Sequence, residues 1–241
     1  MANDSTYGQV IHLPKRKVSA PQDVNVLKMR PTLMDVLPIG SADPAATGFV
    51  LSLLPDATGP VLWVQDYLSQ RENGHLFAPS LKAHGCDHPV LQVTVSHPRD
   101  VLWAMEEGAA CAGLAAVIGE IHGGPSVLDF TATKRLAMRA ETSGVPVYLI
   151  RSGDPGGLSA ARMRWRVGAL PSLPHPHDSR SPGQAQWDME LFRARGRPPG
   201  RWVARYDPAA STAADRLRLV SRAVDGAMDT GDQPISNTTG K

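Results

Sequence analysis

The stretch Gly40–Thr47, with the sequence GSADPAAT, has the length and framing of a phosphate-binding P-loop. That motif requires G-x-x-x-x-G-K-[ST], and this chain carries Ala45 and Ala46 where the second glycine and the lysine belong. The lysine reaches the β- and γ-phosphates, and the glycine lets backbone N–H groups close around them. A nucleotide is therefore expected to meet methyl groups at this loop. The motif predicts P-loop architecture without phosphate-binding chemistry.

The segments that follow the loop support this interpretation. Residues 47–54 continue as a short apolar helix, and Gly59-Pro60 ends it before the run Val61–Val64, which predicts a buried strand. Residues 26–37 form a short lead-in before the loop. Loop, helix and strand therefore occur in the order that a P-loop domain requires.

Strand and helix patterns alternate through the next hundred residues. β-Branched or apolar runs predict strands over 90–95, 115–121 and 145–150, and helical spacing predicts helices over 76–84, 100–112 and 132–143. Glycines follow the helices and supply their C-terminal stops. This alternation predicts an α/β fold with a mostly parallel sheet flanked by helices on both faces.

The distal part has a different pattern. Residues 164–170 alternate and predict one more strand, and residues 171–186 form a Pro/His/Ser-rich loop. Residues 187–192 and 201–206 flank a Gly/Pro turn and predict a β-hairpin. Residues 212–229 begin with a capping-box pattern and predict an amphipathic helix. We expect a flexible basic arm over 1–25, a core over 26–170, the hairpin and closing helix over 187–229, and a disordered tail over 230–241.

Composition limits the function classes. The chain has 241 residues, 42% of them hydrophobic, and its 21 prolines and 22 glycines indicate many loops around one core. The basic run Lys15–Lys17 is followed by no apolar signal segment, and no apolar stretch reaches the roughly 18 residues needed to span a bilayer. We expect a cytoplasmic protein with no membrane contact.

The order of these segments resembles the ImuA family, a RecA-related component of bacterial damage-induced mutagenesis cassettes. The resemblance covers residues 35–207 and rests on Gly59–Val64, Leu76–Leu81 with Gly85–Asp87, Val101–Gly108, Ala116–Ile121, Lys134–Leu136, Arg139–Glu141 and the hairpin Trp187–Tyr206. It implies a RecA-like core and a non-catalytic accessory role in SOS-induced translesion DNA synthesis. The implied partners are an ImuB-type Y-family-like protein and, indirectly, an error-prone C-family polymerase, with RecA itself as a further candidate.

The resemblance also assigns positions to a lost nucleotide site. Thr47 keeps the hydroxyl that would hold Mg²⁺, Glu120 stands where a Walker-B aspartate belongs, and Asp66 stands near the place of the water-activating carboxylate of RecA. Paired acids at strand ends could ligate Mg²⁺, but most phosphate stabilisation is missing without the lysine and the N–H cradle. We therefore expect no cofactor, no metal and no ATP hydrolysis.

Basic residues concentrate in the second half of the chain. Residues 31–150 hold 6 Lys/Arg against 12 Asp/Glu, whereas residues 151–222 hold 13 against 6. The candidates for partner binding are the arginines and tryptophans of the hairpin, types enriched at binding hot spots: Trp187, Arg193, Arg195, Arg201, Trp202 and Arg205. The alternative is that the tryptophans pack the hairpin onto the core and leave solvated arginines.

Two further functions stay open at this stage. Lys15–Lys17 together with Arg162, Arg164 and Arg166 could give weak DNA contact, because binding to the DNA backbone needs little more than positive charge. A cell-division inhibitor like SulA, which binds FtsZ, also resembles a shortened RecA fold without a P-loop. This chain is longer than such inhibitors and carries the distal hairpin, which favours the mutagenesis accessory.

Overall fold

The computed structural model describes residues 27, 30–178, 180–207, 210 and 215–221. The predicted flexible arm over 1–25, the predicted tail over 230–241 and most of the predicted closing helix lie outside these residues. In the described part of the chain, no helix has the length and apolar character needed to cross a membrane.

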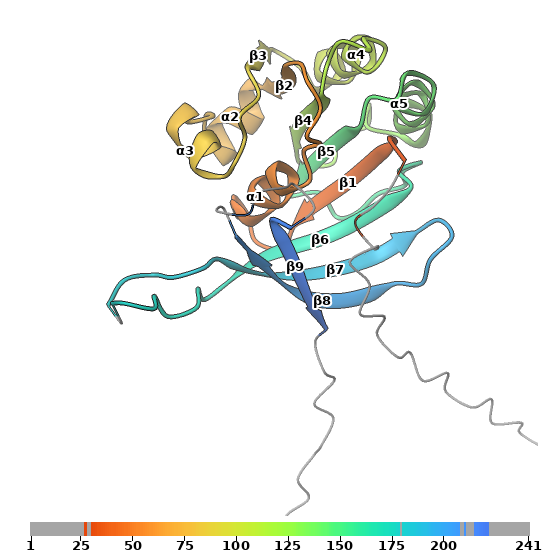
Figure 1. The fold of residues 1–241 in the computed structure, drawn as a ribbon. Helices are drawn as coiled ribbons and strands as arrows, with labels where there is room; N and C mark the ends of the chain where they lie inside the picture. The colour runs from red at the N-terminus through yellow and green to blue at the C-terminus, as the bar shows by residue number, and fades with distance from the viewer. Residues whose placement is uncertain (1–26, 28–29, 179, 208–209, 211–214, 222–241) are drawn as a thin grey trace, which may run out of the picture.

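One nine-stranded sheet organises the molecule (Figure 1). Its order is β3-β2-β4-β5-β1-β6-β7-β8-β9; the strands from β3 to β6 are parallel, and β7, β8 and β9 extend the sheet antiparallel. The strands are β1 (Leu33–Pro38), β2 (Val61–Asp66), β3 (Val90–Val95), β4 (Ala116–His122), β5 (Val147–Ser152), β6 (Met163–Leu170), β7 (Gln186–Ala194), β8 (Gly200–Tyr206) and β9 (Leu217–Ser221). The predicted mostly parallel sheet is thus confirmed.

Helices cover both faces of the parallel part. The five are α1 (Ala45–Ser52), α2 (Tyr67–Asn73), α3 (Ala78–Ala83), α4 (Pro98–Ala109) and α5 (Phe130–Ser143). Side chains alternate along each strand, so that Met34 and Val36 of β1 join α1 in one core and Leu33 joins α4 and α5 in the other. Figure 1 shows α4 and α5 side by side and α1 next to the antiparallel strands.

The structure adds two elements to those predicted. The lead-in before the loop contains β1, which lies in the middle of the sheet between β5 and β6. Asp35 interrupts its apolar run, which hides a buried strand from pattern analysis. The segment after β2 is α2, capped at its N-terminus by the Asp66 carboxylate, which accepts a hydrogen bond from Ser69 N at 2.7 Å.

The hairpin prediction is confirmed, and the predicted closing helix is wrong where the structure describes it. β7 and β8 pair antiparallel around the predicted turn. Residues 217–221, assigned to the helix, form β9 on the edge of β8. Leu217 and Leu219 pack into the core while Arg218 and Val220 face out, a period of two that suits a strand. Residues 212–214 and 222–229 lie outside the described part.

One hydrophobic core joins the parallel and antiparallel parts of the sheet. It contains α1 residues such as Phe49 together with the tryptophans of β6, β7 and β8. The Phe49 and Trp165 rings meet edge to face at 5.6 Å between centroids, and Trp165 lies 5.7 Å from Trp202. Gly48 of α1 lies against Trp187, where an added Cβ would stand 2.8 Å from the indole. The hairpin is therefore part of the main core rather than an appendage.

Candidate functional site

The Gly40–Thr47 loop joins β1 to α1, the position that the motif predicts. Its own Asp43 occupies the entrance to α1: Oδ1 accepts a hydrogen bond from Ala45 N at 2.9 Å, and Oδ2 accepts one from Ala169 N on β6, also at 2.9 Å. A carboxylate at a helix N-terminus takes the place that favours an anion. The Asp43 carboxylate thus lies at the N-terminal end of α1 and links it to β6.

The two alanines of the motif do not face a ligand. Ala45 and Ala46 are buried in the core shared with the hairpin, and neither lines the adjacent pocket. The expectation that a nucleotide would meet their methyl groups is therefore wrong. α1 is packed between the sheet and the hairpin tryptophans, so that these two side chains are directed into protein.

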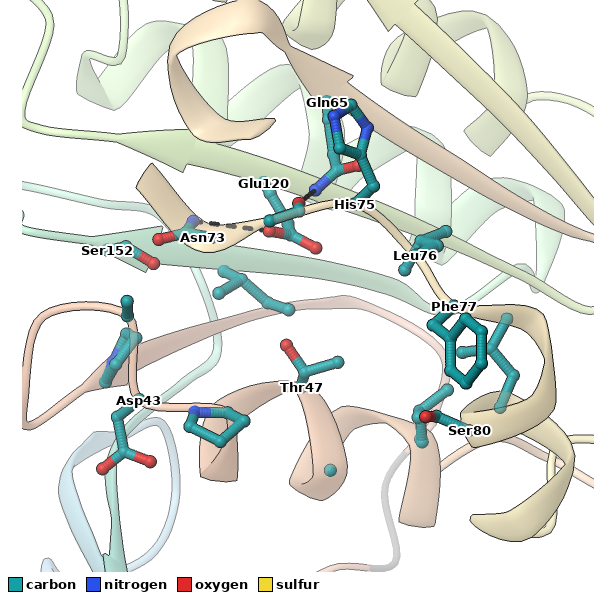
Figure 2. A pocket seen from close by; sticks show the side chains of 18 of the residues that line it. Asp43, Thr47, Gln65, Asn73, His75, Leu76, Phe77, Ser80, Glu120 and Ser152 are labelled. Carbon is teal, nitrogen blue, oxygen red and sulfur yellow. Dashed lines mark hydrogen bonds between the residues drawn. The ribbon is translucent and has the colours of Figure 1, made fainter. Parts of the chain in front are cut away.

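A pocket of about 280 Å³ lies beside the loop, at the carboxyl ends of the parallel strands (Figure 2). This is the edge where open α/β sheets place their ligands. No lysine or arginine is among the residues that line it; its charged and polar side chains are Asp43, Thr47, Gln65, Asn73, His75, Ser80, His84, Glu120 and Ser152. Figure 2 shows Thr47 directed from α1 into this pocket. The structure thus brings Thr47 and Glu120 to one cavity.

Glu120 on β4 is buried and held by hydrogen bonds. Trp63 Nε1 donates to its Oε1 at 2.8 Å, and Asn73 Nδ2 donates to its Oε2 at 3.4 Å. Burial raises the pKa of the Glu120 carboxyl above its ordinary value, while the bonds from Trp63, Gln65 and Asn73 oppose that rise. A carboxyl that resists ionisation is a weakened ligand for Mg²⁺.

Asp66, the other predicted acidic position, is not part of this pocket. Its side chain is fully buried at the end of β2 and caps α2 through Ser69 N. Ser69 in turn donates from Oγ to the Glu120 backbone carbonyl at 3.1 Å. Asp66 therefore fixes the start of α2, and the two acids do not share a site. Asn73 and Gln65, which the sequence did not single out, accompany Glu120 instead.

The structure separates the predicted partner-binding residues into two groups. Trp187 and Trp202 are buried, at 5% and 3% exposed. Trp187 packs against Gly48 of α1, and Trp202 packs against Trp165 of β6. Their burial agrees with the alternative that they pack the hairpin onto the core, and not with partner binding. Arg193, Arg195 and Arg201 are exposed, and Arg205 is half-buried on the same face of β8 as Arg201. The arginines therefore remain as surface candidates.

The arginines proposed for DNA contact are largely engaged within the protein. Arg164 is buried and bonds to Asp35 Oδ2 at 3.1 Å, and Arg151 reaches the same oxygen at 2.8 Å. Burial lowers the pKa of Arg164, and Asp35 opposes this. Arg164 is therefore excluded as a DNA contact in this structure. Lys15–Lys17 lie outside the described residues.

Arg162 and Arg166, the other two arginines of that group, also have protein partners. Arg162 makes a bidentate pair with Glu141, at 2.6 and 2.9 Å. Arg166 lies 4.2 Å from the centre of the Phe192 ring and bonds to Glu190 at 3.2 Å. Both are partly exposed.

Comparison with known proteins places these features in a family. No family model matches the chain. The ImuA proteins of two Caulobacter vibrioides strains, NA1000/CB15N and ATCC 19089/CB 15, are each 33% identical over 199 residues, which is 76% of this chain and 76% of theirs. The crystal structure of the RadB recombinase superposes with a TM-score of 0.53 at 16% identity, covering 77% of this chain and 93% of that one. The fold is thus that of a recombinase core, and the chain belongs to the ImuA family.

Proposed function

We propose that this chain is a non-catalytic accessory of damage-induced translesion synthesis and mutagenesis that acts by binding other proteins. The observation that carries the proposal is the pocket beside the Gly40–Thr47 loop: it has no cation to hold a triphosphate and has the Asp43 carboxylate at the entrance of α1. Phosphoryl-transfer enzymes depend on Lys, Arg and Mg²⁺ to neutralise the phosphates. Family membership supplies the biological setting.

The partner is, on this proposal, an ImuB-type Y-family-like protein, through which the chain joins an error-prone C-family polymerase. The exposed arginines of the second half support a macromolecular partner, because Arg is enriched at interface hot spots. RecA is a further candidate partner through the shared core fold. DNA contact is at most auxiliary, since the predicted cluster Arg162, Arg164 and Arg166 is occupied by acidic and aromatic neighbours.

A pull-down with the ImuB-type protein of the same organism tests the proposal. The purified chain should capture that protein equally well with and without Mg²⁺-ATP. In parallel, fluorescently labelled ATP should show no saturable binding to the chain. Micromolar ATP binding that the Thr47→Ala variant abolishes, or failure to capture the ImuB-type protein, would contradict it. In cells, deletion of the gene should reduce ultraviolet-induced mutation.

A further inference from the structure

A basic groove of about 550 Å³ lies between α5, the segment before β6 and the end of β7, away from the pocket described above. It is lined by Phe130, Lys134, Ala137 and Met138 of α5, by the segment 159–162, and by Arg193, Ala194 and Arg195 at the end of β7. Figure 1 shows α5 and the turn after β7 at the same end of the molecule. We propose that this groove binds an acidic segment of a partner protein that also carries apolar side chains.

The groove carries a net positive charge. Glu141 at its rim pairs with Arg162 and also interacts electrostatically with Arg195. Lys134, Arg193 and Arg195 form no ion pair with any described residue, and all three are exposed. These three cations outnumber the acidic neighbour of the groove, Glu141. The net positive charge attracts carboxylates and repels basic segments, which favours an acidic partner and speeds association.

The helix wall is apolar as well as basic. Phe130, Lys134 and Met138 follow one another at intervals of four along α5 and therefore lie on one side of the helix. Phe130 is 48% exposed and Met138 56%, and Leu158, just before the segment that lines the groove, is 73% exposed. Such large apolar side chains gathered beside a groove mark an interaction site.

The opposite wall is fixed before any partner arrives. Ala160 N donates to Thr133 Oγ1 at 3.0 Å, and Gly157 O accepts from Arg164 Nη2 at 2.9 Å. Asp154 bonds to Gly156 N at 2.6 Å and pairs with Arg151. The loop is thus tied to α5 and to the buried ion pairs of β1, β5 and β6. A preformed wall reduces the ordering cost of binding.

The floor favours a peptide over a nucleic acid strand. It is built from small apolar side chains, Ala137, Ala160, Ala161 and Ala194. Methyl groups can pack on a leucine or phenylalanine of a peptide but give nothing to a phosphate or sugar. Sites for single-stranded DNA combine cations with several aromatic platforms, and Phe130 is the one aromatic residue among those lining this groove.

The inference rests on the proposed function, because the partner protein is the source of the segment. The experiment uses the full chain and fluorescein-labelled short overlapping peptides that cover the ImuB-type protein of the same organism. The variant Arg193→Glu/Arg195→Glu reverses two charges in the groove. Its control, Arg71→Glu/Arg99→Glu, makes the same change in net charge on the exposed surfaces of α2 and α4. Met138→Ala tests the apolar contact without a change in charge.

Acidic peptides should bind the native chain and the control, and the groove variant should weaken binding by at least about tenfold. Met138→Ala should weaken the same peptides to a lesser extent. Unchanged peptide binding by the groove variant would overturn the inference, and so would displacement of those peptides by a labelled oligodeoxythymidine. If the groove variant captures the full-length partner as well as the native chain does, the groove is not the binding site, but the proposed function stands. If the native chain does not capture the partner, the proposed function is contradicted as well.

Discussion

At the scale of single residues, the acidic side chains around the P-loop-like segment each have a structural role. Asp43 accepts a hydrogen bond from the first backbone N–H of α1, Asp66 caps α2, and Glu120 accepts bonds from Trp63 and Asn73. The glycine after the motif, Gly48, leaves the space that the hairpin tryptophan Trp187 occupies. Packing therefore restricts which residues can stand beside this loop.

Gly48→Ala should destabilise the protein by about 1–3 kcal/mol, because the new methyl would stand 2.8 Å from the Trp187 indole and force it to shift. Urea unfolding followed by circular dichroism measures this. Gly40→Ala is the matched control: its added Cβ would find its nearest neighbour at 3.8 Å, and its stability should stay close to native. Equal losses at both positions would contradict the packing argument.

Glu120→Gln should change how stability depends on pH. Folding raises the pKa of this carboxyl by burial, so the folded state binds its proton more tightly than the unfolded chain, where the pKa is near 4.5. Stability is therefore present below that value and is lost as the pH rises through the raised pKa. Glutamine mimics the protonated form, so the variant should exceed the native chain in unfolding free energy by a margin that grows with pH.

Glu141→Gln supplies a control of opposite sign. Hydrogen bonds from Arg162 lower the pKa of Glu141, so its contribution is present at neutral pH and is lost on acidification. That variant should be less stable than the native chain at neutral pH, and the gap should close in acid. Urea titrations over a pH series measure both. A margin for Glu120→Gln that does not vary with pH would show that its carboxyl titrates normally.

At the scale of elements, β9 illustrates how a sheet edge decides local structure. The spacing Leu217, Val220, Val224 and Met228 predicts a helix, yet β8 offers unpaired backbone groups and its pairing with residues 217–221 satisfies them. In a strand, Leu217 and Leu219 face the core, and Val220 is directed outward at 37% exposed. The predicted helix would place Val220 on its apolar side, whereas the strand packs Leu219 against the core and exposes Val220.

Leu219→Ser should cost about 1–2 kcal/mol of stability, because it removes a side chain that packs on the core. Val220→Ser should stay within about 0.5 kcal/mol of the native chain, since its side chain faces solvent. Thermal or urea unfolding of the two variants side by side measures the difference. A larger loss of stability for Val220→Ser than for Leu219→Ser would contradict the strand and favour the amphipathic helix.

At the scale of the whole molecule, the antiparallel strands and the parallel core form one structural unit. Residues of α1, β1 and β2 share a single hydrophobic core with residues of β6, β7 and β8. The ion pairs of Asp35 with Arg151 and Arg164 hold β6, the strand on which β7 pairs, to β1 and β5 within the parallel part. Removing β7 to β9 would leave a large apolar face exposed.

Unfolding of the chain should accordingly be cooperative across this boundary. Tryptophan fluorescence, which reports Trp187 and Trp202 of the antiparallel strands as well as Trp63, Trp103 and Trp165 of the parallel part, should change at the same urea concentration as far-ultraviolet circular dichroism. Two separated transitions, with fluorescence changing first, would show that the hairpin is an independent unit.

Much of the fold follows from the sequence because its evidence is local. Alternation of strands and helices depends on periodic burial within short windows, and the turns depend on Gly and Pro, so β2 to β6 and the hairpin were predictable. The departure from the P-loop motif was likewise visible in Ala45 and Ala46, because the residues at the fixed positions of a motif can be read directly from the sequence. Strand β1 was not predicted, because Asp35 breaks its apolar run.

Only the tertiary structure decided where side chains point and which residues they contact. The methyl groups of Ala45 and Ala46 enter the core, Trp187 packs on α1, and Arg164 bonds to Asp35 across 129 positions of sequence. The groove between α5 and β7 likewise joins residues from distant parts of the chain. Periodicity fixes which face a residue occupies, but its partner depends on strand order, which is set by the packing of the whole chain.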